Sequence, residues 1–220
     1  MRLEFPPTMA LKPEHFISDA VIEERASELL AAYGRRYGYV DRLPIPLEHL
    51  VDYHLELAFD CAVIPGSTPQ IPAALDYGRR AIYLNDLARP LFDQYPGLEN
   101  FSIAHEVGHW ILHVDHAALN QPGLFEVEQR HALLCRHGDR SRREIQAERF
   151  AAYLLMPRDL ILAAVDNRAL TSWAKLYELA GESGVSISAL TVRLAELGLV
   201  FVNPDRSLSR TPVGQRSLYD

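Results

Sequence analysis

Residues 105–109 read His-Glu-Val-Gly-His, which places two imidazoles and one carboxylate close together on any helix they form. Because an α-helix turns by about 100° and rises by about 1.5 Å per residue, His105 and His109 lie one above the other and could hold one metal ion. Glu106 lies on the neighbouring flank, where its carboxylate could take a proton from an attacking water molecule. The pattern therefore predicts a hydrolytic zinc site.

The residues around this motif favour a metal site over a chance pair of buried histidines. Apolar residues recur at helical spacing, at Ile103, Val107, Trp110, Ile111 and Val114. The helix is therefore expected to be buried nearly all round, where unpaired polar groups are costly and a bound metal offsets that cost. Gly108 costs about 1 kcal/mol relative to alanine inside a helix, so we expect another segment to approach closely there.

A tetrahedral zinc site with two histidines needs a third protein ligand and keeps its fourth position for water. The best donor is Glu144, because it extends an apolar helical stripe that runs through residues 147–155. A carboxylate in such an interface needs a partner. Glu148, one turn later, is expected to accept a hydrogen bond from a metal-binding histidine. The main alternative exchanges the roles of the two glutamates.

Two segments carry a specific resemblance. The first reads His-Glu-Val-Gly-His-Trp-Ile-Leu-His, and the second reads Glu-Ile-Gln-Ala-Glu-Arg-Phe-Ala-Ala-Tyr-Leu-Leu-Met-Pro. They resemble the ImmA/IrrE family of zinc metallopeptidases over about residues 18–200. The resemblance implies that His105, His109 and Glu144 bind the metal and that Glu106 is the catalytic base. Glu148 stands where the family has Asn or Asp, so it is a longer acceptor of similar chemistry.

The resemblance also implies a function. It predicts a peptidase that cleaves a helix-turn-helix transcriptional repressor at a specific site and thereby derepresses genes of a mobile element or a stress response. One alternative is a non-catalytic regulator in which residues 170–198 bind DNA or a protein partner and the metal is structural; Glu106 and the open coordination position argue against it. A broad-specificity digestive peptidase is disfavoured because no secretion signal or propeptide is expected.

Other side chains in the sequence could also bind a metal. The Cα atom of His113 lies about 12 Å along the helix axis from that of His105, so His113 is expected to pack beside the ligands or to support them from outside the metal site, as Glu148 is. His131, Cys135 and His137 form a second candidate cluster, but an arginine-rich polar connector is the favoured interpretation. We expect one Zn²⁺ per chain, with Mn²⁺ as the second choice on ligand type alone.

The order of elements, together with the resemblance, predicts an α+β fold. It comprises a mainly helical, zincin-like metallopeptidase core with a small antiparallel sheet, followed by a helix-turn-helix-like helical region. We expect residues 1–17 to be a poorly ordered segment, 18–157 to be the peptidase core, 158–202 to be the helix-turn-helix-like region, and 203–220 to be a polar, mobile tail.

A β-hairpin is predicted in the core, with strands at 73–77 and 80–85 around Gly78. Zinc peptidases commonly bind an extended substrate along the edge of a strand, which uses main-chain hydrogen bonds. The best candidate edge contains Tyr83, Leu84 and Asn85, so these residues are predicted to bind substrate. A sheet that only covers the core is the equally weighted alternative.

Composition narrows the other partners. The 220-residue chain has a net charge of −7, which argues against broad binding to nucleic-acid backbones, and the second helix of the helix-turn-helix-like pattern offers only Arg193 as a cation. No apolar run is long enough to cross a bilayer, and two cysteines suggest no disulfide framework. We therefore expect a cytoplasmic protein without direct nucleic-acid or membrane contact. Nothing in the sequence specifies an oligomeric state.

Overall fold

The computed structural model describes residues 11–64, 67–95, 97–119, 132–134, 141–166 and 168–211. In chain order its elements are α1 (Asp19–Tyr37), α2 (Leu47–His49), the π-helical turn η1 (Leu50–His54), β1 (Ala58–Ala62), β2 (Ala73–Asp76), β3 (Ala81–Asn85), the 3₁₀ turn η2 (Asp86–Ala88), α3 (Arg89–Gln94), α4 (Leu98–His113), α5 (His116–Leu119), β4 (Ala132–Leu134), α6 (Arg142–Leu155), α7 (Arg158–Val165), α8 (Trp173–Ser183), α9 (Ile187–Glu196), β5 (Phe201–Val202) and β6 (Leu208–Ser209). The fold is mixed α+β and mainly helical, as predicted.

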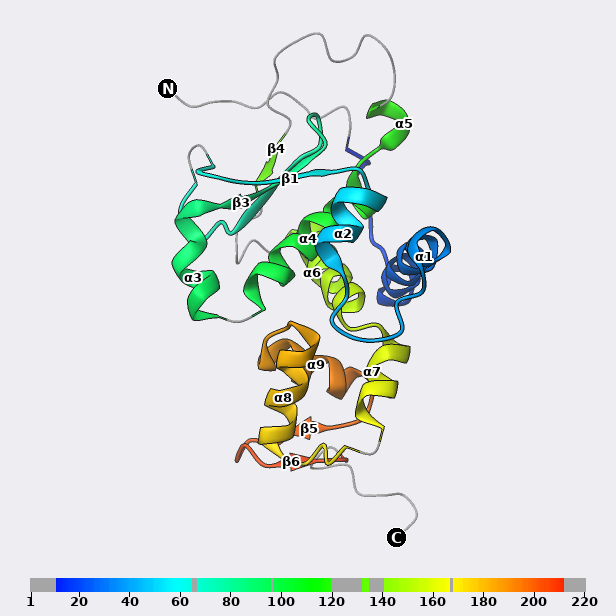
Figure 1. The fold of residues 1–220 in the computed structure, drawn as a ribbon, viewed down its shortest axis with the longest axis vertical. Helices are drawn as coiled ribbons and strands as arrows, with labels where there is room; N and C mark the ends of the chain where they lie inside the picture. Colours follow the sequence, from blue (N-terminus) through cyan, green and yellow to red (C-terminus); the bar gives the residue numbers. More distant parts are fainter. Residues whose placement is uncertain are drawn as a thin grey trace.

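Helices α4 and α6 form the centre of the molecule and pack against each other more extensively than any other pair of described elements. Figure 1 shows the sheet on one side of them and α7, α8 and α9 at the opposite end. Nearly every residue of α4 from Ser102 onward is buried, as its apolar pattern predicted. A Cβ atom on Gly108 would lie 3.1 Å from both the Cα atom and the carbonyl oxygen of Ala147. The predicted close approach of another segment is therefore confirmed.

The larger sheet has the strand order β1-β3-β2-β4. Strands β2 and β3 form the predicted antiparallel hairpin, with Leu75 opposite Ile82. Strand β1 runs parallel to β3, with Phe59 opposite Ile82, so the sheet is mixed and the prediction of an antiparallel sheet is wrong in this respect. Because β3 lies between β1 and β2, it is an interior strand, and the prediction that it offers an edge to substrate is also wrong.

The segment before α1 differs from the poorly ordered stretch that its prolines suggested. Leu11 pairs with Val114 in an antiparallel bridge, and the amide of Lys12 donates to the carbonyl of His113 at 2.8 Å. The guanidinium of Arg143 donates to the carbonyl of Lys12 at 2.7 Å. Residues 11–17 are therefore fixed by α4 and α6, while the remainder of the predicted 1–17 segment lies outside the described residues.

The C-terminal part consists of α7, α8 and α9 with the two-stranded β5–β6 sheet (Figure 1). Helix α8 ends at Gly184 in a left-handed conformation (φ 64°), which glycine adopts without steric cost. Helix α9 begins after Ser186, whose hydroxyl accepts from the amide of Ala189, as an N-cap should. Residues 203–207 connect β5 to β6, and β6 pairs with β5, so the first part of the predicted polar tail belongs to this two-stranded sheet. The rest of the predicted tail lies outside the described residues.

One hydrophobic core runs through both parts of the fold. It joins side chains of α1 and the sheet to those of α6, and continues into Ile161 of α7, Leu176 of α8 and Leu190 of α9. The core therefore links the C-terminal helices directly to the helix that carries Glu144.

Among the described helices, none is both long enough and apolar enough to cross a membrane.

Candidate metal centre

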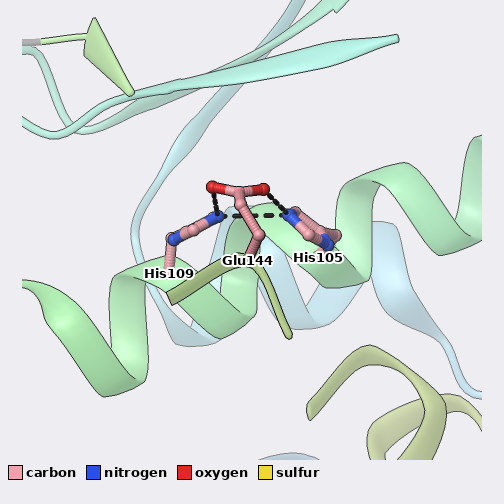
Figure 2. Close-up of side chains that lie close together, drawn as sticks. All are labelled: His105, His109 and Glu144. Atoms are coloured by element: carbon pink, nitrogen blue, oxygen red, sulfur yellow. Dashed lines mark hydrogen bonds and ion pairs between the residues drawn. The ribbon is translucent and has the colours of Figure 1, made fainter. Parts of the chain in front are cut away.

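Three side chains from two helices meet in the interior. Figure 2 shows the carboxylate of Glu144, from the first turn of α6, between the imidazoles of His105 and His109 on α4. The Oε2 atom of Glu144 lies 3.1 Å from Nε2 of His105, and its Oε1 atom lies 3.3 Å from Nε2 of His109. The two Nε2 atoms are 3.1 Å apart. Within the described ranges, this is the group of His, Cys, Asp and Glu residues whose ligand atoms converge closely enough to hold a metal ion.

Local sequence explains why the two helices present these groups to one another. The four-residue spacing places both imidazoles on one face of α4. Ser141 caps α6 by accepting from the amide of Glu144 at 3.3 Å, which fixes the start of this helix and the direction of the glutamate. Gly108 leaves room for the backbone of Ala147. A larger residue at Gly108 would separate the imidazoles from the carboxylate.

The separations of the three ligand atoms suit a tetrahedral metal site. Bonds of about 2.0–2.1 Å at tetrahedral angles place ligand atoms about 3.3 Å apart, close to the observed 3.1–3.3 Å. Two imidazole nitrogens and one carboxylate oxygen are also a donor set of catalytic zinc sites, which keep the fourth position for water or substrate. The residues present therefore fit a catalytic divalent metal of the zinc type.

Electrostatics keep the carboxylate ionised. Burial alone would raise the pKa of Glu144, but hydrogen bonds and charge interactions with His105 and His109 outweigh it and lower the pKa to about 2. Burial alone would likewise lower the pKa of His105, but the hydrogen bond to Glu144 and the charges of Glu106, Glu144 and Glu148 outweigh it and raise the pKa. The site is therefore negatively polarised, which favours a cation.

Glu106 lies next to the metal-binding histidines on α4 and is only 1 % exposed. Its charge is among the causes that raise the pKa of His105, so its carboxylate lies close to the site. A carboxylate on this flank of the helix has the position that the sequence assigned to the proton acceptor.

Glu148 does not occupy the position predicted for it. It is exposed on α6, and among the described residues its carboxylate makes no hydrogen bond to an imidazole. Its effect on the site is a charge interaction with His105. The ligand group contains Glu144 and not Glu148, so the alternative with exchanged roles is not supported. The prediction of Glu148 as the hydrogen-bond acceptor of a metal-binding histidine is wrong.

His113 provides the contact that Glu148 lacks. Its Nδ1 atom lies 3.0 Å from Nδ1 of His109, and its Nε2 atom lies 2.9 Å from Oε1 of Gln146. Burial, reinforced by the nearby His109 and Arg143, lowers the pKa of His113 to about 4, against the hydrogen bond to Gln146. Sequence reasoning gave Gln146 no role, because its spacing of two from Glu144 falls outside the helical stripe.

The predicted substrate residues on β3 have structural contacts. The side-chain amide of Asn85 donates to the hydroxyl of Ser67 and to the carbonyls of Thr68 and Ile71, and its oxygen accepts from the amide of Leu87. Leu84 is buried and Tyr83 is half-buried within the sheet. Asn85 therefore organises the loop before β2. The predicted second cluster of His131, Cys135 and His137 lies outside the described residues.

The fold and this site define a metallopeptidase, with a buried His-Glu-x-x-His helix and a third metal-binding side chain from a second helix. The family model described as the IrrE N-terminal-like domain, Peptidase_M78, matches residues 68–195, more than half of the 220-residue chain. The chain therefore belongs to the IrrE N-terminal-like family of metallopeptidases. A search of curated proteins finds no match. The predicted family and the enzyme class are confirmed.

Proposed function

We propose that this protein is a zinc-dependent endopeptidase of the cytoplasm that cleaves a helix-turn-helix transcriptional repressor at a specific site. Cleavage would derepress genes of a mobile element or a stress response. The convergence of His105, His109 and Glu144, with Glu106 beside them, is the observation that carries the catalytic part. The resemblance of the two motifs to the ImmA/IrrE family supports the substrate.

The division of labour among the residues follows from their chemistry. His105, His109 and Glu144 would hold the ion, which when bound supplies a Lewis acid that polarises the peptide carbonyl and lowers the pKa of water. Glu106 takes a proton from the attacking water as the general base. It then passes that proton to the leaving amine as the general acid.

A direct test mixes the zinc-loaded protein with the repressor encoded by the adjacent regulatory gene and measures fragment masses. We expect two fragments that define one cleavage site, and intact repressor with the Glu106→Gln protein. Casein, incubated in parallel, separates a specific peptidase from a digestive one, because only the latter degrades it. An uncleaved repressor would contradict the proposed substrate, and cleavage by the Glu106→Gln protein would contradict the proposed chemistry.

A DNA-binding regulator is the less supported alternative. Arg193 is the basic residue of α9, and it is only 2 % exposed. It donates to the carbonyl of Met156 and forms ion pairs with Glu23 and Glu196. A guanidinium held in this way does not reach a phosphate. A role of α8 and α9 in packing or in docking a protein partner therefore fits better.

A further inference from the structure

A chain of buried hydrogen bonds leads from the metal centre to the N-terminal segment. It runs from Nδ1 of His109 to Nδ1 of His113 at 3.0 Å, and from Nε2 of His113 to Oε1 of Gln146 at 2.9 Å. It ends where the Nε2 amide of Gln146 donates to the backbone carbonyl of His15 at 2.8 Å. His109, His113 and Gln146 are all at least 95 % buried, so water does not compete for these bonds.

The chemistry of the last acceptor fixes the direction of every bond. A backbone carbonyl only accepts, so the Gln146 atom that faces His15 is the amide nitrogen, and the atom that faces His113 is the amide oxygen. That oxygen also only accepts, so Nε2 of His113 carries a proton. Nδ1 of a neutral His113 is then a lone pair, and the Nδ1 atom of His109 must donate to it.

This direction has a consequence at the metal centre. When a metal ion takes the place of the contact to Glu144, a neutral imidazole with its proton on Nδ1 presents a lone pair on Nε2, and Nε2 of His109 is the atom that faces His105 and Glu144. The opposite tautomer would direct a proton into the place of the ion.

We propose that Gln146, anchored on the carbonyl of His15, acts through His113 as a positioning residue that holds His109 in its metal-binding tautomer and orientation. This inference rests on the proposed metal-binding role of His109. Outer partners of a metal-binding histidine typically change metal affinity by about 10–100-fold when they are removed. An effect of this size is expected here, because the hydrogen bonds through His113 and Gln146 are what disfavour the His109 tautomer with its proton on Nε2.

The anchor belongs to a segment that α4 and α6 hold in place. Lys12 donates from its amide to the carbonyl of His113 and from its ammonium to the carbonyl of Leu112. Arg143, the neighbour of Glu144, donates to the carbonyl of Lys12. These bonds hold the backbone just before His15 against both helices and so help to position the His15 carbonyl. Residues 11–15 precede the family-matched range 68–195, so the metal centre depends on backbone outside that range.

The first experiment compares Gln146→Met with Gln146→Glu. Methionine is similar in size but offers His113 only a weakly accepting sulfur, whereas glutamate keeps an oxygen there. The measured quantity is the zinc dissociation constant, from competition with a chromogenic chelator, and it does not depend on activity. We expect the constant to rise by about 10–100-fold in Gln146→Met and to recover only in part in Gln146→Glu, because a carboxylate keeps the acceptor for His113 but cannot donate to the carbonyl of His15. Equal constants for the wild-type and Gln146→Met proteins would overturn the proposal.

The second experiment reads the tautomers in the wild-type, metal-free protein through the ring nitrogen resonances of ¹⁵N-labelled histidine. It requires no variant to fold. We expect a proton on Nε2 and none on Nδ1 of His113, and a proton on Nδ1 of His109. A proton on Nδ1 of His113 would overturn the proposal.

Glu144→Ala separates this inference from the proposed metal site. If Glu144→Ala loses zinc while Gln146→Met does not, the positioning chain fails and the metal site stands. If Glu144→Ala binds zinc as well as the wild type, the metal site itself fails, and the positioning role fails with it.

Discussion

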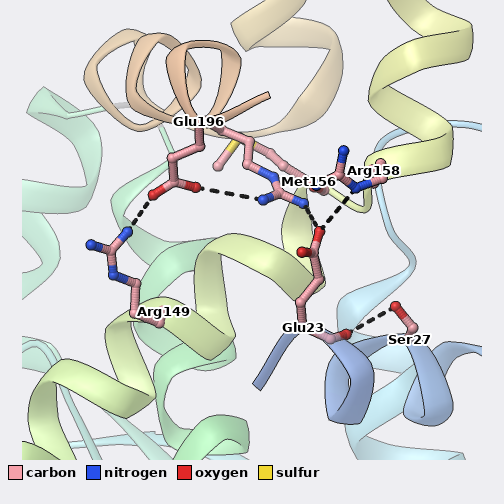
Figure 3. Close-up of polar contacts among 7 residues, drawn as sticks. Glu23, Ser27, Arg149, Met156, Arg158 and Glu196 are labelled. Carbon is pink, nitrogen blue, oxygen red and sulfur yellow. Dashed lines mark hydrogen bonds and ion pairs between the residues drawn. The ribbon is translucent and has the colours of Figure 1, made fainter. Parts of the chain in front are cut away.

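Two polar clusters at opposite ends of α6 place carboxylates inside the protein, and they differ in the groups that stabilise these charges. At the N-terminal end, the Glu144 carboxylate faces two imidazoles whose Nε2 atoms converge with it. At the C-terminal end, the guanidinium of Arg193 lies among Glu23 of α1, Glu196 of α9 and the carbonyl of Met156. Figure 3 shows Arg149 and Arg158 at the outer side of these two carboxylates. One cluster contains its own permanent cation, and the other does not.

The difference explains why one cluster is structural and the other suits catalysis. The guanidinium is always protonated and has donors for three separate acceptors, and its Cζ atom also lies 4.6 Å from the ring centre of Tyr153. This cluster is complete and ties α1, α6 and α9 together. At the other end, three ligand atoms face a common point and can bind a cation from solution. Because the protein supplies three ligands, the fourth coordination position of a bound ion would stay open to water or substrate.

The largest expected effect comes from Glu106, which adjoins the open cluster without belonging to the ligand group. Glu106→Gln removes the proton acceptor but keeps the shape, so we expect peptide cleavage to fall by about 10³-fold. Zinc content should stay at one ion per chain, measured by elemental analysis of the dialysed protein. Substantial turnover by the zinc-loaded variant would show that another group takes the proton.

Next in size is the loss of a ligand. Glu144→Ala should raise the zinc dissociation constant by more than about 100-fold, since even outer partners account for about 10–100-fold. Glu148→Ala, one turn along the same helix but exposed, is the matched control and should change it by about twofold or less. Chelator competition measures both constants. A larger effect from Glu148 than from Glu144 would reverse the ligand assignment.

The comparison of the clusters also shows what could be predicted from the sequence. The four-residue spacing of His105 and His109 predicted the paired imidazoles, and an apolar helical stripe predicted Glu144, because helical periodicity is a local property. The β2–β3 hairpin could be predicted because two short strand segments around Gly78 are also a local pattern. Gln146 was missed because its partners, His113 and the His15 carbonyl, lie 33 and 131 residues away in the sequence. The position of β3 inside the sheet was missed because a parallel neighbour such as β1 leaves no local signal.

Arg193 illustrates the same limit. In the sequence it is the one cation on a presumed recognition helix, and its isolation favours packing or protein docking over DNA binding. Its burial depends on Glu23, which is 170 residues away, so no local pattern reveals it. Arg193 is thus a charged residue of the interior, only 2 % exposed.

The third expected effect follows from removal of the permanent cation, Arg193. Arg193→Met removes a donor from the carbonyl of Met156 and from two carboxylates, which keep Arg149 and Arg158. We therefore expect a loss of about 2–3 kcal/mol in the free energy of unfolding, somewhat below the loss for a fully buried pair, also because Glu23 and Glu196 stay about one-quarter exposed. Arg149→Met is the control. Its side chain is 40 % exposed, and its ion-pair partner among the described residues is Glu196, so its loss should stay below about 1 kcal/mol. Urea denaturation measures both, and equal losses would mean that the Arg193 cluster does not tie the helices together.

The smallest expected effect concerns the distance between the helices that build the open cluster. Alanine is favoured over glycine inside a helix by about 1 kcal/mol, and Gly181→Ala in α8 should show this gain because a Cβ atom there meets nothing within 4 Å. Gly108→Ala should instead lose about 1 kcal/mol, because its Cβ atom meets the backbone of Ala147 at 3.1 Å and overpacking typically costs 1–3 kcal/mol. The shift of α6 should also weaken zinc binding, whereas Gly181→Ala should not. A Gly108→Ala protein as stabilised as Gly181→Ala, with unchanged zinc affinity, would show that the two helices can separate without disturbing the site.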